Sequence, residues 1–140
     1  MGVIIKDCKR EVMATTTYFK PHCFQPKFTE AIAFRESIHM THHFLLDHAK
    51  FEIDCQELYA SQKANDMMQC TYLSTILQDC KDLLSHRANN MLIHMNRIGN
   101  IIAHCLARLT FTFHDFVLIE EVPFEIQTLK ANIIRRDVKL

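Results

Sequence analysis

The stretch FEIDCQEL, residues 51–58, changes its periodicity in the middle. Up to Asp54 apolar and charged residues alternate from residue 50 on, and Phe51 and Ile53 share one face, which is typical of a half-buried strand. After Asp54 the pattern continues as a helix over residues 56–64. An aspartate at a strand end, directly before a helix, is one piece of a carboxylate cluster of the kind that binds metal.

A second stretch, TEAIAFRE at residues 29–36, supplies another carboxylate, Glu30. Pro26 suits the first turn of a helix, where its missing N–H has no intrahelical partner to lose. Small and apolar residues then recur at steps of three and four: Ala31, Phe34, Ile38, Thr41 and Leu45. This spacing predicts an amphipathic helix of about 20 residues with Glu30 close to the edge of its apolar stripe.

The rest of the chain predicts a mixed α/β domain. Strands are expected at residues 3–5, 11–19, 50–55 and 90–95, the first two as a hairpin. Further helices are expected at residues 72–84 and after Asn100, the expected N-cap, with Ile102, Cys105, Leu106 and Leu109 facing the core. Strands interleaved with helices indicate a sheet covered by helices.

Composition sets limits on the function. The 140 residues suit one domain at residues 1–110 with a tail at 111–140, and the net charge of zero argues mildly against strong nonspecific binding to nucleic acid. The net charge does not exclude a local basic groove that binds nucleic acid. No signal peptide or apolar run of about 20 residues is present, so we expect an intracellular protein, nuclear or cytoplasmic, without a membrane partner. The six scattered cysteines are expected to be reduced thiols that serve as small core residues.

The order of these elements and several strings together resemble the plant ribonuclease H-like domains of the reverse-transcriptase-associated, retrotransposon-derived type. The strings are GVIIKD (2–7), TEAIAFRE (29–36), EIDCQEL (52–58), QDCKDLL (78–84), RIGNIIAHCLAR (97–108) and DFVLIEEVP (115–123). The resemblance implies an RNase H-like fold, a mixed sheet with helices on both faces. It also implies that the central first strand of that sheet, which carries the family's first Asp, is missing here by truncation or degeneration.

The resemblance further implies a hydrolase, an endonuclease that cuts the RNA strand of RNA–DNA hybrids with two Mg²⁺ ions held by four carboxylates. Glu30 matches the helix carboxylate and Asp54 the strand-end carboxylate, which makes them the expected catalytic and metal-binding residues. His104 stands at the position of the family's last carboxylate, where histidine is common in the plant group but is a poor ligand for Mg²⁺. We therefore expect weak or absent cleavage.

The expected function is that of an RNase H type-1-like domain that binds an RNA–DNA hybrid or RNA. Arg97, Asn100 and Arg108 are the expected nucleic-acid contacts, although lone arginines are weak evidence. The alternatives are a non-catalytic nucleic-acid-binding module and a degenerate retroelement relic.

Each candidate residue also has a purely structural interpretation. Asp54 and Glu57 have the spacing of a capping box, and Glu30 suits the first turn of a helix, near the positive end of its dipole. His104 suits a partly exposed helix position. The histidines at 39, 42 and 43 have spacings that zinc accepts, but three histidines on the outer side of a helix are more often solvated.

Overall fold

The computed structural model describes residues 1–9, 11–18, 25–64, 71–87, 89–97, 100–113, 116–119 and 126–127. The chain divides into two compact units. Unit 1 comprises Met1–Pro21 and Ile101–Leu140, and unit 2 comprises His22–Asn100. Each unit has its own strands, helices and buried residues.

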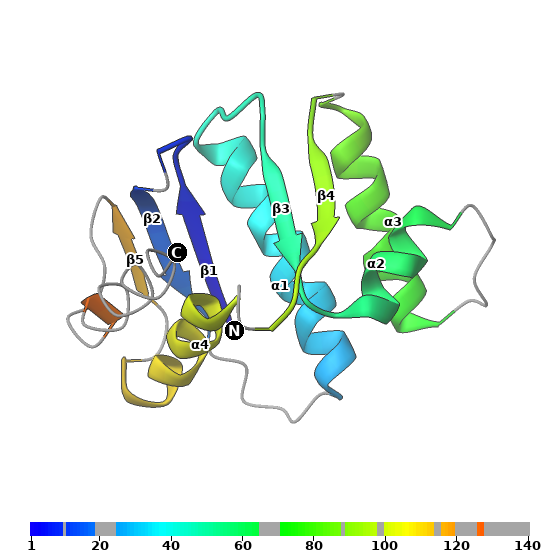
Figure 1. Cartoon of the computed structure of the whole chain (residues 1–140). Coiled ribbons are helices and arrows are strands. Elements are labelled where there is room, and N and C mark those ends of the chain that lie inside the picture. The colour runs from blue at the N-terminus through cyan, green and yellow to red at the C-terminus, as the bar shows by residue number, and fades with distance from the viewer. Residues whose placement is uncertain are drawn as a thin grey trace, which may run out of the picture. The chain divides into compact units, whose positions relative to one another are not determined.

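Figure 1 labels the elements of both units. Unit 1 contains β1 (Gly2–Lys6), β2 (Val12–Thr17), α4 (Ile101–Phe113) and β5 (Phe116–Ile119). Unit 2 contains α1 (Pro26–His43), β3 (Lys50–Ile53), α2 (Gln56–Lys63), α3 (Tyr72–Ser85) and β4 (Met91–His94). Every helix and strand expected from the sequence is present, with ends that differ by a few residues. The additional strand is β5, which lies in the segment expected to be a tail.

β1 and β2 form the predicted hairpin in unit 1. They pair antiparallel, with Gly2 opposite Thr17 at the open end. The connection has no glycine, and the Asp7 carboxylate instead accepts hydrogen bonds from the backbone N–H groups of Lys9 (2.9 Å) and Glu11 (2.8 Å). An Asp side chain that satisfies nearby backbone donors stabilises a turn without the positive φ that glycine supplies.

β2 is the central strand of unit 1, with β1 on one side and β5 on the other. β5 pairs antiparallel with β2, from Ala14 opposite Ile119 to Thr17 opposite Phe116. β2 is deeply buried from Ala14 to Thr17. The three-stranded sheet of unit 1 therefore depends on residues far apart in the sequence.

Gly2 sets the distance between β1 and α4. A Cβ atom at this position would lie 2.5 Å from the carbonyl oxygen of Ala103 and 2.6 Å from the backbone nitrogen of Ala107. Both are backbone atoms, so the helix has no side chain to turn aside, and only glycine allows this approach. On the same helix Ile102 and the fully buried Leu106 belong to one core cluster, which confirms their expected place in the core.

The sheet of unit 2 consists of β3 and β4, which pair in parallel from Lys50 opposite Met91 to Ile53 opposite His94. In β3 the side chains alternate between exposed and buried, with Phe51 and Ile53 buried, as the sequence predicts. Parallel and antiparallel pairs thus both occur in the chain, alongside helices α1, α2, α3 and α4. The predicted α/β fold class is confirmed.

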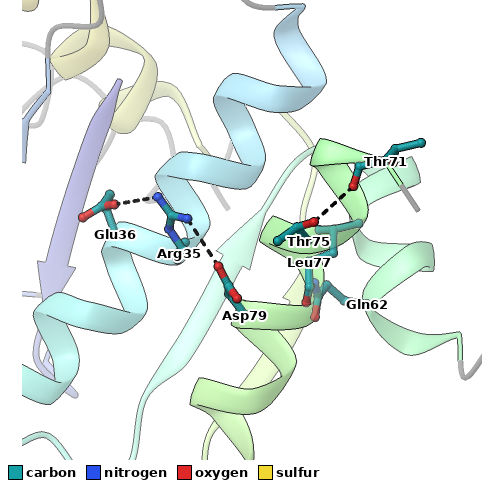
Figure 2. Close-up of polar contacts among 7 residues, drawn as sticks. All are labelled: Arg35, Glu36, Gln62, Thr71, Thr75, Leu77 and Asp79. Carbon is teal, nitrogen blue, oxygen red and sulfur yellow. Dashed lines mark hydrogen bonds and ion pairs between the residues drawn. The ribbon is translucent and has the colours of Figure 1, made fainter. Parts of the chain in front are cut away.

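α3 is held to both other helices of unit 2 by polar contacts (Figure 2). Arg35 of α1 lies between its neighbour Glu36 (3.6 Å) and Asp79 of α3 (3.5 Å). The side-chain amide of Gln62 on α2 donates to the carbonyl oxygen of Leu77 on α3 at 2.9 Å. These contacts border a buried apolar layer that includes Leu77 itself.

The cysteines divide by burial. Cys80 is fully buried on α3, as expected of a core thiol, and burial raises its pKa to about 12, so it stays protonated. Cys55 and Cys105 are half-buried, and Cys8 is exposed, so the expectation of a core position is wrong for Cys8. The cysteines at 23 and 70 lie outside the described residues.

In the described part of the chain, none of the helices has the length and apolar character that crossing a bilayer requires.

The apolar stripe of α1 is confirmed at Ala31, Phe34, Ile38 and Thr41, all of which are buried. The prediction is wrong for Leu45, whose side chain is 77% exposed because the helix ends at His43. The N–H of Leu45 bonds to the carbonyl of His42 and that of Leu46 to the carbonyl of Thr41, the pattern of a Schellman motif. Leu45 therefore occupies the left-handed position, with φ of 55°, that glycine usually fills.

Leu45→Gly is expected to stabilise the protein by about 0.5–1 kcal/mol. The substitution relieves a left-handed strain of roughly 1–2 kcal/mol and loses part of this gain to the greater freedom of glycine in the unfolded chain. Urea unfolding followed by circular dichroism measures the difference. Leu45→Ala is the matched control, because it removes the exposed side chain but keeps the Cβ. An equal gain in both variants would contradict the role of strain.

His42, near the end of α1, is not on the outer side of the helix as the sequence suggested. Its Nε2 atom is buried and has no hydrogen-bond partner among the residues that the structure describes. His39 is exposed, as expected. The pKa of His42 is lowered, first by desolvation and then by the nearby positive charges of Arg87, His39 and His86. Arg87 is itself bound to Asp47 at 2.8 Å, which fixes its charge near the end of the helix.

Stability is expected to fall on acidification because of His42. Its folded pKa lies below the ordinary value of about 6.5, so the unfolded chain takes up the proton first. The contribution of neutral His42 to the free energy of unfolding is fully present above about pH 6.5. It declines as the pH drops below that value toward the pKa of His42 in the folded protein. Unfolding free energies measured between neutral and mildly acidic pH check this expectation. His42→Leu flattens the profile in this range, whereas His48→Leu, an exposed loop control, leaves it unchanged; identical profiles for all three proteins would refute it.

Candidate functional site

Glu30 and Asp54 both lie in unit 2, on two segments that run alongside each other in opposite directions. The rings of Phe34 on α1 and Phe51 on β3 meet edge to face, with centroids 5.7 Å apart. At the other end, Lys27 Nζ on α1 lies 2.7 Å from Glu57 Oε2 on α2. Residue 30 lies between 27 and 34, and residue 54 lies between 51 and 57. The two contacts therefore bracket Glu30 and Asp54 at the same part of the interface.

Helical spacing puts Glu30 on the side of α1 that makes these contacts. Residues three and four apart are neighbours on a helix surface, so Lys27, Glu30 and Phe34 follow one another along one side. Glu30 is half-buried, next to the fully buried Ala31. Because α1 begins at Pro26, Glu30 is in the second turn, and the interpretation as a first-turn residue near the helix dipole is wrong.

Asp54 directly follows β3, as the sequence predicts, and is half-buried. The expected capping box is wrong. The N-cap of α2 is Cys55, one residue later, and no side chain caps this helix end. Glu57, which was expected to reach back to the N-cap, is instead bonded to Lys27, and this bond lowers the pKa of its carboxyl group.

Lys27 is the residue of this region that the sequence did not single out. It places a positive charge one turn before Glu30 and fixes the first turn of α2 against α1 through Glu57. Its signal in the sequence is its spacing of three residues before Glu30, but that spacing alone does not identify Glu57 as its partner. A pair of exposed side chains adds little stability, so its contribution here is to positioning.

The donor set limits which metal ions the site can hold. Among the described residues, no three His, Cys, Asp or Glu side chains are grouped so that they could hold a metal ion. This leaves the zinc interpretation of the three histidines on α1 without support. Glu30 and Asp54 supply hard oxygen donors suited to Mg²⁺, which binds through one or two carboxylates together with waters and substrate phosphates. Two carboxylates do not suffice for a two-metal centre.

The other candidate residues fall in different parts of the chain. His104 and Arg108 lie on α4 of unit 1, four residues apart and therefore on one side of the helix. His104 is half-buried and Arg108 is exposed. Arg97 is exposed in unit 2, where its carbonyl accepts a hydrogen bond from the N–H of Asn100 at 3.2 Å. Within unit 2, Arg97 and Asn100 thus form one short turn that follows β4.

A comparison with known families identifies the family of the chain. A family model described as "Reverse transcriptase-like" matches residues 1–110. The chain belongs to this reverse-transcriptase-like family. The match supports an RNase H-like domain, the fold that the sequence suggested. No curated protein and no solved structure matches the chain.

Proposed function

We propose that this reverse-transcriptase-like domain is an RNase H type-1-like module that binds an RNA–DNA hybrid or RNA, with weak or no cleavage. The observation that carries the proposal is the bracketing of Glu30 and Asp54 by the contacts at Phe34–Phe51 and Lys27–Glu57. Family membership over residues 1–110 supports the same assignment. An origin in a plant retroelement stays a prediction.

In this proposal Glu30 and Asp54 hold one Mg²⁺ ion together with a phosphate group of the nucleic acid. Such sharing is usual for Mg²⁺, which keeps several waters and completes its shell with substrate oxygens. His104 is assigned to the catalytic set through its place in the family pattern. Its imidazole is a poor substitute for a carboxylate at a magnesium centre, because imidazole prefers zinc, copper, iron and nickel. Among the described residues no further carboxylate joins Glu30 and Asp54 in a metal-binding group, which is the reason to expect little cleavage.

Arg97, Asn100 and Arg108 are assigned to phosphate contacts. The exposed guanidinium groups of Arg97 and Arg108 suit phosphate oxygens, which arginine binds with two parallel hydrogen bonds. With a net charge of zero, affinity has to come from such local positive groups rather than from the charge of the whole protein.

Binding to a short fluorescein-labelled RNA–DNA hybrid is expected at low salt and is expected to weaken as salt rises, because each phosphate contact releases bound counterions. Arg97→Gln and Arg108→Gln should each reduce the slope of log affinity against log salt by about 1. Fluorescence anisotropy measures both quantities. Lys9→Gln, an exposed cation in the β1–β2 turn, is the control and should leave the slope unchanged. No binding by the unaltered protein at low salt would refute the proposed function.

Mg²⁺ is expected to tighten hybrid binding on the order of 10-fold, a coupling typical of two linked ligands. Glu30→Gln and Asp54→Asn should each remove this effect, because a neutral amide is a weaker ligand for Mg²⁺ than a carboxylate. Glu52→Gln, an exposed carboxylate two residues before Asp54, is the matched control. Anisotropy with and without Mg²⁺ measures the coupling, and gel analysis of the same hybrid measures cleavage. Magnesium-dependent tightening or cleavage that survives both substitutions would contradict the assignment.

A further inference from the structure

An aromatic ring, a lysine and a histidine come together at one end of unit 2. Tyr59 lies on α2, and the ammonium group of Lys63, one turn later, is 5.9 Å from the centre of its ring. The ring of His94, the last residue of β4, is also 5.9 Å from that of Tyr59, at an angle of 52°. Lys63 and His94 are exposed and Tyr59 is half-buried. We call these three residues the Tyr59 cluster.

The Tyr59 cluster is next to Asp54 through the backbone. His94 is opposite Ile53 in the parallel pair, and Ile53 directly precedes Asp54. The N–H of Met95 continues the pairing to the carbonyl of Ile53 at 2.9 Å. From the other direction, the N–H of Tyr59 bonds to the carbonyl of Cys55, the residue after Asp54, at 3.0 Å. The cluster and Asp54 therefore lie at the same end of β3 and β4.

The charges that α2 contributes beside the Tyr59 ring favour a negatively charged ligand. Gln56, Tyr59 and Lys63 follow one another at helical spacing along one side of α2. The single acidic residue of this helix, Glu57, is already bonded to Lys27 of α1. This side of α2 thus carries an aromatic ring and a positive charge, and α2 adds no carboxylate to it.

We propose that the Tyr59 cluster binds a nucleotide of a single nucleic-acid strand, with a base stacked on Tyr59 and a phosphate beside Lys63. The proposal rests on the proposed nucleic-acid-binding function and adds the surface beyond Asp54 that the strand follows. An aromatic ring combined with a cation is the usual means of sequence-independent binding to single strands, because every base has a face that stacks. His94 flanks the ring and supplies a further donor to the backbone of the strand.

Intramolecular packing alone would also place these residues together, so the test separates the two roles. Tyr59→Leu is expected to weaken binding of a fluorescein-labelled oligo(dT) roughly 5- to 150-fold, the range for loss of one stacked base. An oligonucleotide of the same length with abasic sites is expected to bind both proteins alike. Tyr59→Phe keeps the ring and is expected to bind like the unaltered protein. Tyr72→Leu is the matched control, because Tyr72 is an exposed tyrosine of α3 that stacks on Phe28.

A spectroscopic readout complements the affinities. The chain has no tryptophan and three tyrosines, so tyrosine emission can be followed directly. Oligo(dT) is expected to quench part of this emission, and Tyr59→Leu is expected to remove that part. Lys63→Gln, which keeps the ring, is expected to reduce the salt slope by about 1 while the quenching remains.

The outcomes distinguish this inference from the function on which it rests. If the unaltered protein binds neither the hybrid nor oligo(dT) at low salt, the proposed function is refuted, and the inference about the Tyr59 cluster is refuted with it. If it binds and Tyr59→Leu, shown by thermal unfolding to be folded, binds equally well, the inference alone is overturned. Equal weakening by Tyr59→Leu on the abasic strand would also overturn it, because the effect would then not come from stacking.

Discussion

The edge-to-face contact between Phe34 and Phe51 is the interaction that ties the helix carrying Glu30 to the strand that leads to Asp54. It joins the middle of α1 to the middle of β3, and such aromatic pairs add about 0.5–1.5 kcal/mol to the burial of their surfaces. α1 is also joined to α3 by the ion pair of Arg35 with Asp79. The ion pair of Lys27 with Glu57, seven residues back along α1, fixes the first turn of α2 against α1. Glu30 on α1 and Asp54 directly after β3 lie between the aromatic contact and this ion pair.

Periodicity was sufficient to predict this framework. The steps of three and four from Ala31 to Thr41 identified the buried side of α1, and the alternation in residues 50–55 identified β3. Both patterns repeat several times, so errors at single positions do not change the result. Predictions failed where one residue decided the structure. Leu45 fits the helical period, yet the helix ends two residues earlier, and the Schellman motif that ends it uses no residue with a recognisable capping signal.

The capping box at Asp54 failed for a different physical reason. Asp54 and Glu57 have the right spacing, but Glu57 has a competing partner in Lys27, which comes from another helix thirty residues away. A charged partner offers a stronger hydrogen bond than a backbone amide, so the local motif gives way to the tertiary contact. The same limit explains why β5 was missed. The apolar run of β5 is short. Its partner strand β2 lies about a hundred residues earlier, so no local sequence pattern predicts that the two strands pair.

Dependence on tertiary contacts also explains why the sequence predicted the candidate residues of the site but not how many of them lie together. The sequence shows which residues are carboxylates, but the number that meet is a property of the packing, and metal chemistry depends on that number. Under the proposed function, Glu30 and Asp54 together satisfy part of the octahedral shell of one Mg²⁺ and leave the remaining positions to water and phosphate. In-line phosphoryl displacement with two metals requires ions about 4 Å apart and carboxylates on both. Under this proposal the pair is therefore expected to recognise a phosphate rather than to break its ester bond.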